Sequence, residues 1–224
     1  MKLDLHMHSE QSCDSFMKPD KMIKVAKSLG LDGIAITDHN TLPKIKAQEG
    51  DDFLVIPGEE ILTRRGEIIG LNLTEKIPKL LSVGETVDRI YEQGGTLLIP
   101  HPFDITGKCL MCNYKKLKRS FLFEAFNGGV ILNYFNVLAK NYAKKHDFAV
   151  AGSSDAHDYK YIGYGYTELK KYETSIDGAL KSLLKGRGFA VGGKVAPNGA
   201  ALDIYVNVFT EPIARFMTWY KKKK

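Results

Sequence analysis

Five of the six histidines in this chain stand in short motifs that also contain acidic residues or proline. The motifs are DLHMHS at 4–9, TDHN at 37–40, PHP at 100–102 and SDAH at 154–157. His6 and His8 are two residues apart in a segment with the pattern of a strand, so both rings should project from one face and bind the same ion. This grouping of imidazoles and carboxylates predicts a multinuclear metal site.

Each motif follows an apolar run that is typical of a buried strand. GIAIT precedes Asp38 and His39, LVIPGE precedes Glu60, TLLIP precedes His101, FLFE ends at Glu124, and FAVAGSS precedes Asp155. In a parallel α/β barrel the carboxyl ends of the strands converge on one mouth. Ligands that are scattered through the sequence can therefore meet in space.

Strand and helix patterns alternate along the chain. Strands are expected at 2–7, 33–37, 53–56, 67–73, 96–100, 121–125 and 148–152. Helices are expected from Pro19 to Gly30, around 41–48, and over 84–95, 130–146 and 176–188. No glycine-rich nucleotide motif follows the first strand, so the alternation favours a parallel sheet closed as a barrel over an open doubly wound sheet.

The composition suits one α/β domain, which we expect to span residues 1–220, because 44% of the residues are hydrophobic and 26% are charged. No apolar run approaches the roughly 18 residues of a membrane helix, and no signal-peptide profile is visible, so we expect a cytoplasmic protein without a membrane span. Three cysteines, an odd number, argue against a disulfide framework. We interpret Cys109 and Cys112 as loop thiols, with half of a zinc site or a redox pair as alternatives.

The terminal lysines Lys221–Lys224 supply four of the six positive charges in the formal net charge of +6. We interpret this tail as a solvated end, and the alternative is a tether for a polyanion such as nucleic acid or anionic lipid. The preceding segment, 201–220, is apolar enough to pack on the barrel or on another subunit. The sequence leaves the oligomeric state open.

Six motifs in this order resemble the PHP (polymerase and histidinol phosphatase) domain family. They are DLHMHS, TDHN, GEE, PHP, the glutamate of FEAFNG, and SDAH, and together they cover nearly the whole chain. The resemblance implies a distorted (β/α)7 TIM-like barrel in a single domain. It also implies a site for two or three divalent metal ions and the hydrolysis of phosphate esters.

The resemblance implies a set of metal ligands. One ion would be held by His6, His8, Glu60 and Asp155, a second by Glu60 as a bridge with His101 and Glu124, and a third by Asp14, His39 and His157. Glu60 is preferred to Glu59 because the family's bridging acid stands two residues after the glycine, here Gly58. Zinc, manganese and iron all remain open, although acids at 14 and 124, where some members have histidine, favour harder ions.

Several of these acids have a second interpretation. Asp14 could cap a turn, and Glu124 could pair with a lysine. Asp4 and Asp38 stand next to predicted ligands, so they either orient imidazoles or make ordinary strand-end hydrogen bonds.

Three divalent ions would outweigh the four carboxylates and leave a positive mouth that attracts a phosphate. We therefore predict a phosphoesterase for a small phosphorylated metabolite or a nucleotide, with attack by a metal-bridging hydroxide and with Glu60, Asp155 and His101 as catalytic residues. The alternatives are a nuclease or oligonucleotide-trimming enzyme, or a non-catalytic module stabilised by metal.

Two basic features could recognise the substrate. Arg64, just past Glu60, is predicted to bind phosphate, and a solvated turn is the alternative. The loop 103–120 could form a polyphosphate or nucleic-acid lip, or it could be a solvated loop that lacks stacking aromatics apart from Tyr114. Its cations are Lys108, Lys115, Lys116, Lys118 and Arg119.

Overall fold

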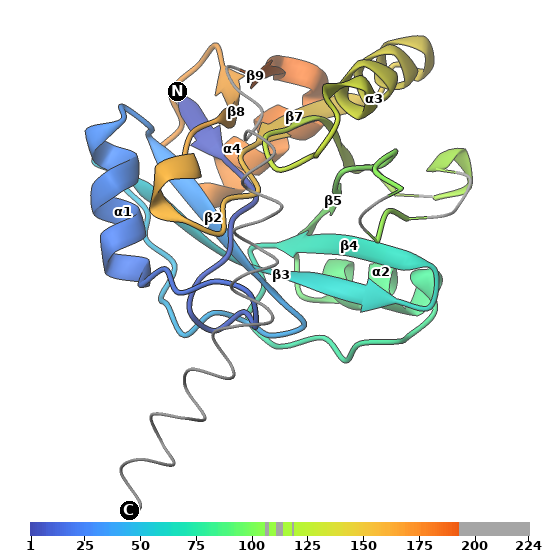
Figure 1. Cartoon of the computed structure of the whole chain (residues 1–224), viewed down its shortest axis with the longest axis horizontal. Helices are drawn as coiled ribbons and strands as arrows, with labels where there is room; N and C mark the ends of the chain where they lie inside the picture. Colours follow the sequence, from blue (N-terminus) through green and yellow to red (C-terminus); the bar gives the residue numbers. More distant parts are fainter. Residues whose placement is uncertain (106–107, 111–113, 118, 193–224) are drawn as a thin grey trace, which may run out of the picture.

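The computed structural model describes all residues except 106–107, 111–113, 118 and 193–224. Within the described residues, one mixed sheet has the strand order β7-β6-β5-β4-β3-β2-β1-β8-β9 (Figure 1). The strands are β1 (Lys2–Asp4), β2 (Gly33–His39), β3 (Leu54–Thr63), β4 (Gly66–Leu71), β5 (Thr96–Ile99), β6 (Leu122–Asn127), β7 (Ala149–Ser153), β8 (Gly165–Leu169) and β9 (Gly188–Gly192). The α-helices are α1 (Pro19–Ser28), α2 (Val83–Glu92), α3 (Asn133–His146) and α4 (Ile176–Ser182). Short helical turns are η1 (Tyr114–Lys116), η2 (Tyr159–Tyr161) and η3 (Leu183–Arg187).

The sheet is parallel from β1 to β3 and from β5 to β7, but β4 runs antiparallel to both of its neighbours. Only Arg64 and Arg65 separate β3 from β4, and a connection this short can join only antiparallel strands. The strand predicted at 67–73 therefore exists, but it belongs to a hairpin. β8 and β9, which the sequence did not predict, form a second antiparallel pair beside β1.

The two ends of the sheet curl toward each other. Beyond the strand ends, Met7 and Ala156 form a parallel bridge that joins the continuations of β1 and β7. At the β7 edge, Gly152 donates its N–H to the Thr167 hydroxyl of β8 at 2.9 Å. A Cβ at Gly165 would collide with the Ser153 carbonyl oxygen, so this close approach requires glycine. The nearly closed sheet confirms the predicted distorted barrel.

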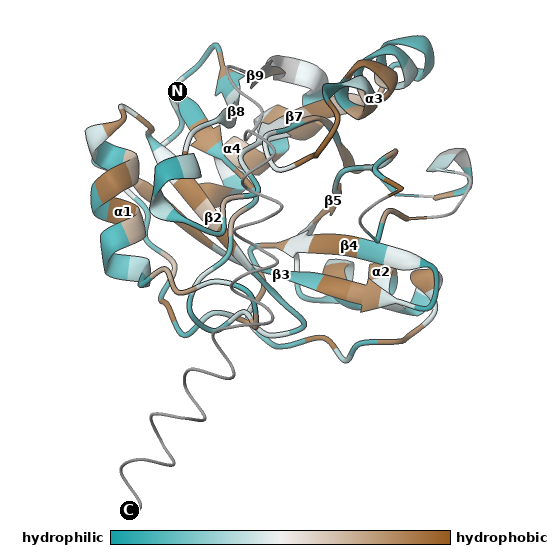
Figure 2. Cartoon of the chain, viewed as in Figure 1, coloured by the Kyte–Doolittle hydropathy of each residue, from teal (hydrophilic) through white to brown (hydrophobic). Residues whose placement is uncertain are grey.

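Hydrophobic residues recur along the strands and the helices (Figure 2), and they form three buried clusters among the described residues. The inner cluster includes Leu3, Leu54 and Ile56 from the strands, and α4 adds Ala179 and Leu180 to it. Outer clusters lie beneath the other helices: α1 packs with β2 and β3, and α2 and α3 pack with β4, β5 and β6. The inner cluster, with α4, forms the floor of the barrel.

Local signals explain where the helices begin and why one prediction is wrong. Pro19 is the first residue of α1, and Ser82 with Glu85 forms a reciprocal capping box at the start of α2. The short helix predicted around 41–48 is absent from this described segment. Pro43 lacks an N–H, and Gln48 instead pairs its backbone with Val55 at the start of β3.

Candidate metal centre

Strand alternation directs four side chains into the barrel above its apolar floor. On β3, Leu54 and Ile56 belong to the inner cluster, and Glu60 follows them on the same face. The same parity places His39 above Ala35, Glu67 beside Ile69 and Glu124 above Leu122. Polar side chains therefore occupy the mouth of the barrel, and apolar side chains fill its lower part.

Four ligand atoms lie close together at this mouth. His6 Nε2 lies 3.1 Å from His8 Nε2, 3.3 Å from Glu60 Oε2 and 3.3 Å from Asp155 Oδ1. His8 Nε2 lies 3.4 Å from Glu60 Oε2 and 3.2 Å from Asp155 Oδ1. The separations within the group of His6, His8 and Glu60 leave room for an ion about 2 Å from each atom, which is the bond length of zinc to nitrogen or oxygen ligands. This arrangement suits a divalent cation.

Glu60 and its neighbour Glu59 point in opposite directions. Glu60 Oε1 lies 3.0 Å from His101 Nε2, so its two oxygens face different histidines. Glu59 Oε2 instead accepts a hydrogen bond of 2.8 Å from the Ile77 N–H. Burial raises the pKa of Glu59 to about 7. Of the two acids, only Glu60 has the geometry of a bridge within this cluster.

His101 and Glu124 are held together by hydrogen bonds. Glu124 Oε1 lies 3.2 Å from His6 Nδ1, and Glu124 Oε2 accepts the His101 backbone N–H at 2.5 Å. Asn127, which the sequence reasoning missed, donates to Glu124 Oε2 at 2.8 Å and to Asp155 Oδ2 at 3.1 Å. The only signal for Asn127 was its place in FEAFNG, three residues after Glu124.

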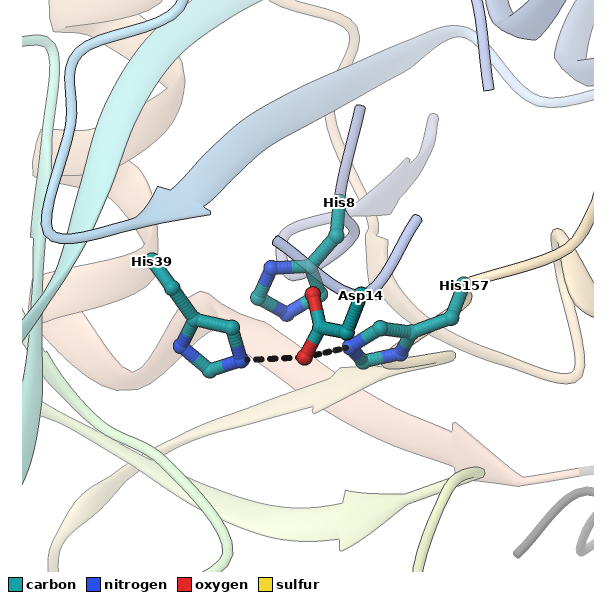
Figure 3. A group of neighbouring side chains, drawn as sticks. All are labelled: His8, Asp14, His39 and His157. Atoms are coloured by element: carbon teal, nitrogen blue, oxygen red, sulfur yellow. Dashed lines mark ion pairs between the residues drawn. The ribbon is translucent and has the colours of Figure 1, made fainter. Parts of the chain in front are cut away.

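A second group, which shares His8 with the first, consists of His8, Asp14, His39 and His157 (Figure 3). Asp14 Oδ2 is 3.1 Å from His39 Nε2 and 3.3 Å from His157 Nε2. The His8 ring stacks between those of His39 and His157, with centroid distances of 4.4 and 4.2 Å. One ligand atom from each of these four residues falls within 4.8 Å of the others, so the group could hold an ion.

Glu67 is a further acid that the sequence reasoning did not single out. It is buried on β4, and its Oε1 lies 3.6 Å from His39 Nδ1, which is itself 3.0 Å from Glu60 Oε2. These three residues form another group with metal-binding spacing. Glu67 could be found only once β4 was known to run antiparallel, because a strand entering the mouth from its open end brings its first residues there.

The buried charges at the mouth balance one another. Although burial lowers the pKa of a histidine, nearby Glu60 and Asp14 raise the pKa of His39 to about 10. Burial likewise opposes protonation of His101, but Glu60 raises its pKa to about 9. Burial, together with His157 and His39, lowers the pKa of His8 to about 3. Positive charge is therefore favoured next to the carboxylates, where a metal ion would also be favoured.

The backbone at two of these residues is strained. His101 and Asp155 have φ values of 29° and 52°, in a region that side-chain-bearing residues seldom adopt. Each lies two residues after the end of a strand, β5 or β7, where the backbone turns at the mouth of the barrel. Strain of this kind concentrates at functional sites.

Asp4 and Asp38 bind backbone and hydroxyl groups at the strand ends. Asp4 accepts the N–H groups of Ser154 at 2.9 Å and Gly163 at 3.1 Å. Asp38 accepts the N–H and the hydroxyl of Ser9 at 2.5 and 2.7 Å. These contacts correspond to the second interpretation of Asp4 and Asp38, in which both acids make ordinary hydrogen bonds at strand ends. Through these bonds the two acids fix the loops that carry the histidines.

The predicted substrate-binding cations occupy different places. Arg64 is exposed at the tip of the β3–β4 hairpin, where its Nε donates to the Leu80 carbonyl at 3.0 Å. Arg119 stacks over the Tyr91 ring of α2, with its guanidinium carbon 5.2 Å from the ring centroid. Lys108 lies at the mouth, with Nζ 3.1 Å from Glu67 Oε1. Tyr114 is buried, so it offers no stacking surface.

The donor set fits divalent ions. It consists of imidazole nitrogens and carboxylate oxygens, as zinc, manganese and iron sites do. Seven buried side-chain atoms of the described residues have no hydrogen-bond partner, and they include His8 Nδ1, Asp14 Oδ1 and His101 Nδ1. A bound cation would give Asp14 Oδ1 a partner, and a buried atom left without one costs about 1–3 kcal/mol.

The remaining sequence features are only partly covered by the described residues. Cys13 is exposed and Cys109 is buried, and both are free thiols, whereas Cys112 lies outside the described residues. The tail Lys221–Lys224 and segment 201–220 also lie outside them. No helix in the described part of the chain combines the length and the apolar character that crossing a bilayer requires.

Comparison with known proteins supplies the family context. A family model described as PHP domain matches residues 4–159, and one described as PHP-associated matches residues 133–187. An uncharacterized protein of Methanocaldococcus jannaschii, MJ0417, is 38% identical over 177 residues, which are 76% of this chain and 71% of the relative.

Two further similarities involve nucleases. A 5'-3' exoribonuclease of Haemophilus influenzae is 26% identical over 85% of this chain and 67% of its own length. The fold resembles that of Endonuclease Q, solved with a 27-mer duplex bearing an abasic lesion, with a TM-score of 0.58 and 17% identity. That match covers 87% of this chain and 58% of the nuclease, and at this identity it shows a shared fold.

Proposed function

Because the chain belongs to the PHP domain family, we propose that it is a metal-dependent phosphoesterase acting on a small phosphorylated metabolite or a nucleotide. One observation carries the proposal: nine predicted ligands from distant segments lie at one mouth, eight of them in overlapping groups with metal-binding spacing, while Glu124 contacts His6 and His101 beside these groups. They are His6, His8, Asp14, His39, Glu60, His101, Glu124, Asp155 and His157.

We assign one ion to the site of His6, His8, Glu60 and Asp155. Glu60 would bridge to a second ion with His101 and Glu124, and Glu67 lies close enough to His39 and Glu60 to be an additional ligand. A third ion would be held by the Asp14 group of Figure 3. The ions would be zinc, manganese or iron, in a number of two or three.

Bound divalent ions supply Lewis acidity, which polarises the phosphoryl oxygens and lowers the pKa of a coordinated water. The residues of the chain do the positioning. Glu60 spans the histidines on both sides, Asp155 and His101 are held in place by their turns, and Asn127 keeps Glu124 and Asp155 apart at fixed distances. The apolar floor below excludes water from the barrel interior.

The test is phosphate release by the full chain. The protein would be stripped with a chelator, reloaded with Mn²⁺, Zn²⁺ or Fe²⁺, and assayed against p-nitrophenyl phosphate and a panel of phosphorylated metabolites and nucleotides. We expect metal-dependent release that the chelator abolishes. Full loading with no release from any ester would instead favour the non-catalytic module.

A second candidate is a nuclease or oligonucleotide-trimming enzyme. It is favoured by the similarity to the Haemophilus influenzae exoribonuclease. Hydrolysis of single-stranded oligonucleotides that falls steeply as salt rises would support it, since phosphate contacts release counterions. Preference for mononucleotides or sugar phosphates, with little dependence on salt, would argue for the first candidate.

The cellular and domain predictions accompany this proposal. We propose a cytoplasmic location on the grounds of the odd cysteine count, and a single domain over 1–220 with a basic tail at 221–224. The two basic-loop residues with described partners, Lys108 and Arg119, divide between the mouth and α2. The loop therefore does not act as one continuous lip over its described part.

A further inference from the structure

Lys108 is held at the rim of the mouth by the backbone around it. The Glu67 N–H donates to the Lys108 carbonyl oxygen at 2.7 Å, and this bond joins the loop after β5 to the first residues of β4. At Gly66, with φ of 122°, a Cβ would collide with the Cys109 carbonyl oxygen. The loop is thus packed directly on the hairpin, and the position of Lys108 is set by main-chain contacts.

The ammonium of Lys108 faces the candidate metal centre. Its Nζ is 3.1 Å from Glu67 Oε1, and that oxygen is 3.6 Å from His39 Nδ1. Glu60 and Asp14, two further acids at the mouth, also attract this positive charge. The side chain remains 59% exposed, so an ammonium with three donors has room for a ligand besides Glu67.

Arg64, which the sequence predicted to bind phosphate, instead makes hydrogen bonds to backbone carbonyls away from the mouth. Its backbone N–H donates to the Leu81 carbonyl and its Nε donates to the Leu80 carbonyl, both at 3.0 Å. These bonds fasten the segment after β4 to the hairpin tip. Within the described part of the chain, Lys108 is the lysine or arginine that forms an ion pair with an acid of the cluster.

We propose that Lys108 binds a non-bridging oxygen of the substrate's phosphoryl group and that Glu67 positions its ammonium for this contact. The inference rests on the proposed phosphoesterase function and names a specificity determinant for it. An added positive charge at the rim favours a dianionic phosphomonoester over the monoanionic phosphate of a diester. The substrate class is therefore a terminal phosphomonoester.

The experiment compares Lys108→Ala and Lys108→Arg in the metal-loaded full chain. For Lys108→Ala we expect KM for p-nitrophenyl phosphate and the inhibition constant of inorganic phosphate to rise by about 10-fold or more, because a charge-assisted hydrogen bond is lost. The metal content should be unchanged, and kcat should change less than KM. Lys108→Arg should restore most of the affinity, since it keeps the charge.

Lys181→Ala is the matched control. Lys181 also pairs with an acid, Asp177, at 2.7 Å, but it does so on the surface of α4. It should leave KM, phosphate inhibition and metal content at wild-type values. Direct titration of the metal-loaded variants with inorganic phosphate by calorimetry gives a readout that does not require turnover.

The outcomes separate the two proposals. A metal-loaded wild type that hydrolyses no ester defeats the phosphoesterase function, and its calorimetric phosphate affinity still reports on Lys108. An active wild type whose Lys108→Ala variant keeps the same KM and phosphate affinity overturns the inference. So does a raised KM in Arg64→Ala alone, or metal loss in Lys108→Ala, which would make Lys108 a partner of Glu67 only.

Discussion

Replacing Glu60 by glutamine should show whether this acid binds metal ions or is only a buried acid paired with histidines. Each Glu60 oxygen lies 3.0–3.3 Å from a histidine nitrogen, so its charge acts on both sides of the mouth. Two unit charges about 4 Å apart attract by about 4 kcal/mol at an effective dielectric constant near 20. At about 1.4 kcal/mol per tenfold, this corresponds to about a thousandfold in affinity. Because an ion is doubly charged, the loss for each ion that contacts Glu60 should be at least this large.

The neighbouring acid provides the comparison. Glu59 is as buried as Glu60, but its pKa of about 7 means that the neutral form is already substantial near neutral pH. A glutamine there can still accept the Ile77 N–H, so Glu59→Gln should keep its metals and its activity within a few-fold.

The assay is elemental analysis after equilibration in buffered metal, together with phosphate release. Glu60→Gln should lose two ions and all measurable turnover, while circular dichroism shows an intact fold. If Glu59→Gln lost the ions instead, or if Glu60→Gln retained them, the assignment of Glu60 as the bridge would be refuted.

Asp14→Ala should deplete about one ion, because its Oδ2 lies within 3.3 Å of both His39 and His157; unchanged metal content would make Asp14 a turn cap. Asn127→Leu should lower activity by about 10- to 100-fold at an unchanged fold, since it removes the hydrogen bonds that hold two acids, and wild-type turnover would argue against that role. Cys109 should react with iodoacetamide much more slowly than the exposed Cys13, because burial raises the pKa of its thiol. Peptide mapping after brief labelling at pH 8 measures this, and equal modification of the two would contradict the packing of the loop.

The barrel and most of the mouth could be predicted because their signals are local. Short apolar runs marked β2, β3, β5, β6 and β7, and each one ended where a histidine or an acid follows. The preference for Glu60 over Glu59 came from the resemblance to the family, and alternation along β3 explains why the two neighbouring acids face opposite sides.

The missing parts depend on contacts between distant segments. β8 and β9 carry mixed sequences whose strand character comes from pairing with β1 and with each other. Glu67 reaches the mouth only because the Arg64-Arg65 turn reverses the chain, and Asn127 contacts Asp155 across two strands. The erroneous helix around 41–48 shows the same limitation, because pairing with Val55 outweighs local propensity there.

The left-handed backbone at His101 and Asp155 has a consequence for adaptation. Each such conformation costs on the order of 1–3 kcal/mol, and glycine would adopt it without strain. Selection for heat resistance alone would thus favour glycine at His101 and Asp155. The proposed reaction, however, requires both side chains. Variants of this barrel that tolerate higher temperatures should therefore carry their compensating substitutions away from the rim, in the apolar floor or beneath the outer helices.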